Sequence, residues 1–147
     1  MWKTVHLAVT GEEFLRQLRA VRPALEHLYA VHWCDAELCN GGFHQFYTNP
    51  TGVLAPEAAD GFEAIGLTEC AALVRKTMSF FGTPYPRDQV ERIGRLEAVE
   101  GETREEWDPF FASDDAYYAL VDAASLVLRN AADAYAERMG LGVQNGS

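Results

Sequence analysis

The sequence predicts an all-α protein, a single-domain bundle of about six to seven helices over residues 1–147. Apolar residues recur at steps of three or four along most of the chain, and no alternating run is long enough to form a sheet. Two stretches have the capping-box form of a helix start, Thr10 to Glu13 and Thr103 to Glu106. At 147 residues and 48% hydrophobic composition, the chain can bury one core, which predicts one domain.

The first half should contain two helices joined at a proline. The first begins near Gly11 and ends at Pro23, which lacks an amide hydrogen and also suits the first turn of the next helix. The second helix, about 23–39, is apolar on almost every side, which is typical of a buried element. Asn40-Gly41-Gly42 then predicts a left-handed C-cap, because glycine takes positive φ at little cost.

The remaining helices are expected between prolines, serines or threonines at their starts and glycines at their ends. They are Pro56 to Ile65, Thr68 to Phe81, about 87–98, a short segment from Thr103, and about 114–139 capped by Ser113, Asp114 and Asp115. The last helix should bury one face, formed by Tyr117, Val121, Ala124, Leu128, Ala131 and Tyr135.

The composition excludes several classes of function. A net charge of −10 argues against direct binding to nucleic acid or to an anionic membrane, and it permits a basic protein partner. No apolar run approaches the roughly 18 residues of a membrane span, and the N-terminus lacks a signal peptide, so a cytoplasmic location is expected.

The three cysteines should be reduced, buried thiols. The spacing of His32, Cys34, Cys39 and His44 does not fit a zinc site, and no metal or cofactor is expected.

Polar side chains crowd the glycine corner. Glu37, Asn40, Gln45 and Asn49 could serve catalysis, metal binding or structure. A tight corner leaves backbone groups unpaired at about 1–3 kcal/mol each, and amide side chains can bond to them, so the structural interpretation is favoured. The alternative is a small enzyme or ligand-binding protein in which these residues and His44 line a pocket at Gly41-Gly42. A third possibility is a dimer interface at the corner, with Phe46 and Tyr47 exposed.

Most of the negative charge lies in one short stretch. Residues 97–122 contain nine acids and a single base, Arg104, which accounts for −8 of the net −10. Acids three or four apart on a helix stand about 5–6 Å apart, the same order as the phosphate spacing along one DNA strand. A solvated face is the other explanation, because first-turn acids are favoured by the helix dipole and surface charge aids solubility.

The corner resembles the signature E-x-N-N-G-G-F-x-Q-[FY]-x-x-N of a bacterial family whose best-known member is a DNA-mimic protein. The matching positions are Glu37, Asn40, Gly41, Gly42, Phe43, Gln45, Phe46 and Asn49. Ala64-Ile65-Gly66, the proline-rich loop and Asp114 to Tyr118 are also similar, so that the resemblance covers about residues 12–139. One departure is Cys39, which stands where the family has the first of two asparagines.

The resemblance implies an all-helical fold and, for the characterised member, a dimer whose acidic surface occupies the DNA-binding face of a transcriptional regulator. We therefore expect an acidic, non-enzymatic binding protein with a basic DNA-binding protein as partner and a possible homodimer. The residues expected to bind the partner are Glu97, Glu100, Glu102, Glu105, Glu106, Asp108, Asp114 and Asp115.

Overall fold

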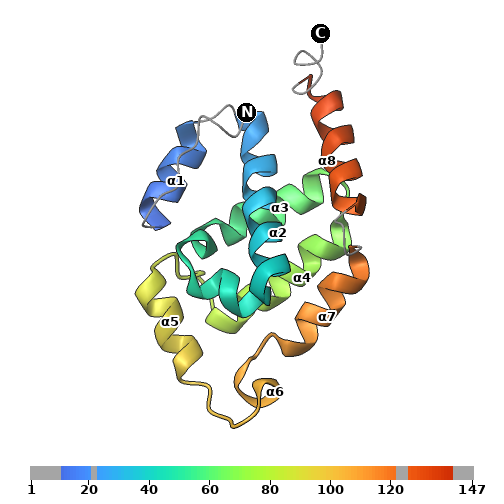
Figure 1. Ribbon diagram of the computed structural model, residues 1–147. Coiled ribbons are helices and arrows are strands. Elements are labelled where there is room, and N and C mark those ends of the chain that lie inside the picture. Colours follow the sequence, from blue (N-terminus) through green and yellow to red (C-terminus); the bar gives the residue numbers. More distant parts are fainter. Residues whose placement is uncertain (1–10, 21–22, 122–125, 141–147) are drawn as a thin grey trace.

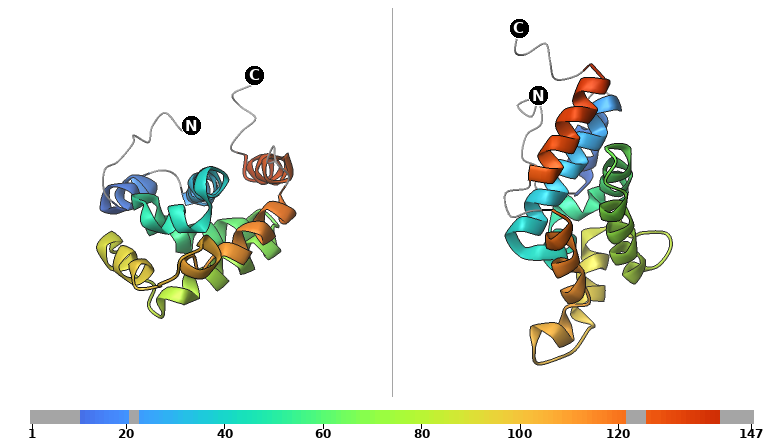
Figure 2. Two further views of the ribbon diagram at one scale, coloured as in Figure 1. Left: turned by 60° about the horizontal axis from the view of Figure 1, so that its bottom comes forward. Right: turned by 90° about the vertical axis from the view of Figure 1, so that its right-hand side faces the viewer.

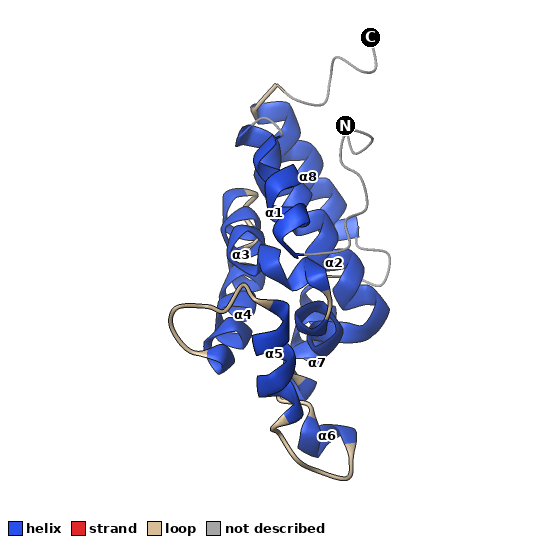
Figure 3. Cartoon of the chain, turned by 90° about the vertical axis from the view of Figure 1, so that its left-hand side faces the viewer, coloured by secondary structure: helices blue, strands red, loops and turns tan. Residues whose placement is uncertain are grey.

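The computed structural model describes residues 11–20, 23–121 and 126–140 (Figure 1). The described residues form helices and turns without a strand, which confirms the all-α prediction (Figure 3). The longer helices are α1 (Gly11–Ala20), α2 (Pro23–Thr48), α3 (Ala55–Ala64), α4 (Thr68–Met78), α5 (Gln89–Glu97), α7 (Phe111–Leu120) and α8 (Leu126–Arg138). The short ones are η2 (Pro50–Leu54), η3 (Ser79–Phe81) and α6 (Arg104–Trp107).

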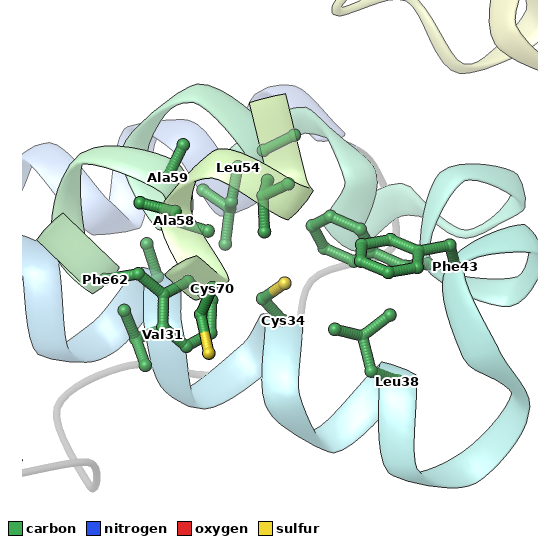
Figure 4. Packing of buried hydrophobic residues seen from close by; sticks show 14 of the residues in the cluster. Val31, Cys34, Leu38, Phe43, Leu54, Ala58, Ala59, Phe62 and Cys70 are labelled. Atoms are coloured by element: carbon green, nitrogen blue, oxygen red, sulfur yellow. The ribbon is translucent and has the colours of Figure 1, made fainter. Parts of the chain in front are cut away.

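Helix α2 is the centre of the molecule. It contacts α1, α3, α5, α7 and η2, and α8 lies beside its first half, where His27 Nδ1 and Tyr135 Oη are 3.2 Å apart (Figure 2). Its apolar side faces η2, α3 and α4: Val31 lies near Phe62 and Leu38 near Phe43, in one buried cluster (Figure 4). Burial on this scale explains why α2 has few polar positions along its first half.

Gly42 divides α2 into two helical halves. Its backbone has φ 80° and ψ −174°, whereas the residues on either side are helical. This differs from the predicted left-handed C-cap in its ψ, which is far from the left-handed helical value. The helix that resumes after Gly42 forms the second side of the expected corner. The prediction that the helix stops at a glycine is confirmed. Residues with a side chain rarely adopt this backbone conformation, so the position requires glycine.

The C-terminal helix predicted over about 114–139 is wrong in its extent. Helix α7 begins at Phe111, so Ser113 and Asp114 lie inside it, and the chain is extended at Val121, with φ −117° and ψ 140°. Helix α8 then begins at Leu126. The predicted apolar face is buried at Tyr117, Val121, Leu128 and Tyr135, while Ala124 lies outside the described residues.

The cysteines are free thiols in two environments. Cys34 and Cys70 lie in the core, and burial raises the pKa of Cys34 well above its ordinary value and that of Cys70 to about 11. Their thiolates are therefore scarce at neutral pH. Cys39 is exposed, which corrects the prediction that all three are buried.

Replacement of Gly42 by alanine should destabilise the protein much more than the same change at Gly41. A Cβ at Gly42 would lie 2.4 Å from Asp114 Oδ2 and require a strained φ. A Cβ at Gly41 would meet only the side chain of Gln45, including its Cβ at 2.9 Å, and would need no positive φ. We expect Gly42→Ala to lower the free energy of unfolding by at least about 2 kcal/mol. Chemical denaturation of both variants measures the difference, and an equal loss for the two would contradict this explanation of the break.

Candidate functional site

The helix that resumes after Gly42 is capped by a carboxylate from a distant helix. The backbone N–H of Phe43 donates to Asp114 Oδ1 of α7 at 2.8 Å, across 71 residues of sequence. Such N–H groups have no partner inside their own helix, so Asp114 supplies one. Burial raises the pKa of Asp114, while the bond from Phe43 opposes that shift.

Arg104 joins this cap to a second buried acid. Its Nε donates to Asp108 Oδ2 at 3.2 Å, and its Nη2 lies 3.5 Å from Asp114 Oδ2. Asp108 also accepts the backbone N–H of Phe110 at 2.9 Å, and its side chain is fully buried. Asp108 and Asp114 are only 2% and 8% exposed, so their predicted place on a partner-binding surface is corrected. Both carboxylates accept hydrogen bonds from backbone N–H groups inside the protein.

Glu37 and Asn49, two residues of the predicted corner motif, bond to each other. Glu37 Oε2 accepts from Asn49 Nδ2 at 2.6 Å and from Thr51 Oγ1 at 2.9 Å, which ties α2 to η2. Gln45 lies against Gly41, where an added Cβ would be 1.9 Å from its Oε1, and Asn40 is exposed on the outer surface. The contacts of Glu37 and Asn49 therefore join side chains of the corner to one another, rather than to the unpaired backbone groups that the structural interpretation expected.

The two other possibilities for the corner find little support. Of the residues expected to line a pocket, Glu37 and Asn49 are engaged with each other, and only His44 lines the groove described below. Phe46 and Tyr47 are each 0% exposed, so the expected dimer interface through these rings is corrected. Both rings belong to the core around Phe43.

Arg92, which belongs to no motif recognised in the sequence, is fully buried beside the corner. Its guanidinium donates to the carbonyls of Tyr47 and Asn49 at 2.9 Å each, to Arg87 at 2.7 Å and to Pro86 at 3.3 Å. These include orphan carbonyls at the C-terminal end of α2. Burial lowers the pKa of Arg92 below its ordinary value, because the surrounding dipoles replace water incompletely.

Gly52 makes room for this arrangement. A Cβ there would lie 2.7 Å from the Phe46 carbonyl oxygen and 3.0 Å from Arg92 Nε and Nη2. Tyr85 donates its hydroxyl to the Gly52 carbonyl at 2.5 Å, and Gln89 Nε2 donates to Thr48 O at 2.9 Å. The segment that precedes and begins α5 is therefore fastened to the end of α2.

Six of the predicted partner-binding carboxylates are exposed, and we call them the acidic surface: Glu97, Glu100, Glu102, Glu105, Glu106 and Asp115. The first five lie at the end of α5, in the connection and in α6, which together project from one end of the molecule (Figures 2 and 3). Within the described residues none of the six forms an ion pair, since Arg104 is engaged with Asp108 and Asp114. Asp122, the ninth acid of the segment, lies outside the described residues.

A capping box holds the acidic connection in place. Glu106 Oε2 accepts the backbone N–H groups of Thr103 at 3.0 Å and Glu102 at 2.7 Å, and the Thr103 hydroxyl accepts from Glu106 N at 3.3 Å. These bonds lower the pKa of Glu106. The capping box predicted at Thr103 is confirmed, whereas Thr10 of the first predicted box lies outside the described residues.

A groove of about 280 Å³ adjoins this projection. It is lined by His44 and Thr48 of α2, Ile93, Leu96 and Glu97 of α5, Val99 of the connection and Trp107 of α6. The rings of His44 and Trp107 meet edge to face, 5.2 Å between centroids. Its walls are mainly apolar, with one carboxylate, and we call it the Trp107 groove.

Comparison with known families identifies the chain. Residues 19–138 match the family of the DMP19-like protein. The chain belongs to the DMP19-like family. This confirms the resemblance to DNA-mimic proteins drawn from the corner motif. Searches of the curated proteins and of the solved structures give no match.

The DMP19-like chain has two further properties within its described part. No group of three or more histidine, cysteine, aspartate or glutamate side chains is placed there to hold a metal ion. None of the described helices is both long enough and apolar enough to cross a bilayer.

Replacement of Arg92 by methionine should be among the most destabilising single changes in this DMP19-like protein. Four buried carbonyls would lose a donor, so we expect a loss of at least about 3 kcal/mol in the free energy of unfolding. Arg75→Met is the control, because Arg75 forms only half-exposed ion pairs with Asp60 and Glu63, and should cost under about 1 kcal/mol. Similar losses, measured by denaturation, would show that the Arg92 contacts are unimportant.

The variants Asp114→Ala and Asp114→Asn should distinguish two effects of Asp114 on stability: its hydrogen bond to the Phe43 N–H and its negative charge. Alanine removes the acceptor for Phe43 and should cost about 1 kcal/mol, whereas asparagine keeps an oxygen there. Because the folded pKa of Asp114 is raised, its ionisation destabilises the native state as pH rises from its ordinary value, 3.8, through the raised value.

The stability of Asp114→Asn relative to the wild type should therefore increase across that pH range and stay constant above it. Denaturation at a series of pH values measures the gap between the two proteins. A stability of Asp114→Asn that falls relative to the wild type as pH rises would show that the carboxylate is the favoured form at this position.

Proposed function

We propose that this DMP19-like protein is a non-enzymatic binding protein that acts in the cytoplasm. Its acidic surface would occupy the basic DNA-binding face of a partner, such as a transcriptional regulator. The observation that carries the proposal is the division of acids within residues 97–115. Asp108 and Asp114 are buried and pair with the half-exposed Arg104, whereas the six others are exposed without a cationic partner among the described residues.

This division supports a binding role over simple solvation. A solvated face gains nothing from concentrating charge, because neighbouring like charges repel by about 0.2–0.5 kcal/mol per pair. Helix capping accounts for Glu106, but Glu100 and Glu102 lie in the connection before α6, where they cap no helix. A charged projection of one sign attracts a basic surface over about one Debye length, roughly 8 Å at physiological salt.

The family also suggests a homodimer, which stays a prediction. Phe46 and Tyr47 cannot contribute to one without local unfolding, since both are in the core. A dimer would have to leave the projection accessible to act as proposed.

Reversing two charges on the projection should weaken partner binding. The variant Glu100→Lys with Glu102→Lys is suited to this test, because both side chains are exposed and neither forms a hydrogen bond or an ion pair within the described part of the chain. The control, Asp133→Lys with Glu137→Lys, makes the same charge change at exposed positions of α8. Glu106 is left unchanged because it caps α6.

The measurement is the capture of DNA-binding proteins from a host extract on the immobilised full chain, followed by elution with duplex DNA or salt. We expect to capture a protein that duplex DNA displaces. The variant with Glu100→Lys and Glu102→Lys should bind it about tenfold more weakly at low salt, and the control variant should bind it as tightly as the wild type. Equal binding to both variants, or a partner that duplex DNA and high salt fail to release, would contradict DNA mimicry.

A further inference from the structure

The Trp107 groove has a size suited to one side chain. Its volume of about 280 Å³ lies just below the range of about 300–1,000 Å³ in which small-molecule ligands bind. It opens where α5 passes into the acidic connection, so it lies within the proposed binding surface. A partner seated on that surface would cover the groove.

The lining combines three kinds of contact. Leu96 and Val99 give aliphatic walls, Trp107 and His44 give aromatic rings, and Glu97 gives a carboxylate that forms no ion pair within the described part of the chain. Trp107 is only half-buried, so part of its surface is available to a ligand. An apolar occupant would bury the groove walls but leave Glu97 without a partner.

We propose that the Trp107 groove receives an arginine side chain of the basic partner, an inference that rests on the proposed function. The aliphatic stem of the arginine packs against Leu96 and Val99, and its guanidinium meets Trp107 and Glu97. Arginine suits this lining better than lysine, because its planar group is weakly hydrated, stacks on aromatic rings and pairs with carboxylates through two N–H groups.

The acidic surface and the groove then have separate tasks. Glu100, Glu102 and Glu105 attract any basic face over a distance, whereas the groove distinguishes one kind of cation at contact. Charge alone would bind arginine and lysine equally. A preference for arginine is therefore the property that the groove adds.

The test uses the full chain labelled with ¹⁵N and two blocked peptides, tetra-arginine and tetralysine, titrated at low salt. The indole N–H resonance of Trp107, identified with Trp107→Phe, reports on the groove. We expect tetra-arginine to shift this resonance and to bind about twofold to fivefold more tightly than tetralysine. Glu97→Gln should remove that preference without unfolding the protein, because Glu97 is exposed.

Glu137→Gln, the same change on α8, should leave the preference intact. Equal affinity for the two peptides, or a Trp107 resonance that tetra-arginine does not shift, would overturn the arginine site. If the peptides still shift residues 100–106 in a salt-dependent manner, the acidic binding surface stands without the groove. The proposed function itself is tested separately, by partner capture with the Glu100 and Glu102 reversal and by release of the captured protein with duplex DNA or salt.

Discussion

The arrangement of this protein depends on how the chain ends α2. The carbonyl of Tyr47 in the last turn of α2 and that of Asn49 just after it accept hydrogen bonds from the Arg92 guanidinium. The same guanidinium donates to the carbonyls of Pro86 and Arg87 in the segment that precedes α5. A buried cation without a carboxylate is costly, so its four carbonyl contacts must all be present. Since Arg92 belongs to α5, the same bonds that finish α2 also position α5 and the acidic connection that follows it.

A second set of contacts holds the other end of that connection. Gly42 interrupts α2, Asp114 caps the resumed helix, and Arg104 joins Asp114 to Asp108 next to α6. The corner motif and the acidic stretch, which are separate in the sequence, thus form one continuous set of contacts.

The helices could be predicted because their start and stop signals are local: Pro23, Thr103 and Gly82 act within a few residues of themselves. The burial of charged side chains could not be predicted from the sequence. Arg92 lies in a strongly amphipathic helix and reads as a surface residue, and its carbonyl partners come from segments up to 45 residues away. Asp114 likewise looks like a helix cap, and only the tertiary fold shows that it caps the helix after Gly42. The break between α7 and α8 carries neither glycine nor proline and gave no signal.

Residues 98–103 connect α5, which Arg92 anchors, to α6, which Arg104 anchors. The Glu106 carboxylate accepts the backbone N–H groups of the last two residues of this connection. A short strap fixed at both ends has few conformations to lose when a partner covers it. Ordering a loose loop would consume much of the favourable free energy of association. Preorganisation of this kind lets a handful of carboxylates present a stable charge pattern on a protein as small as this one.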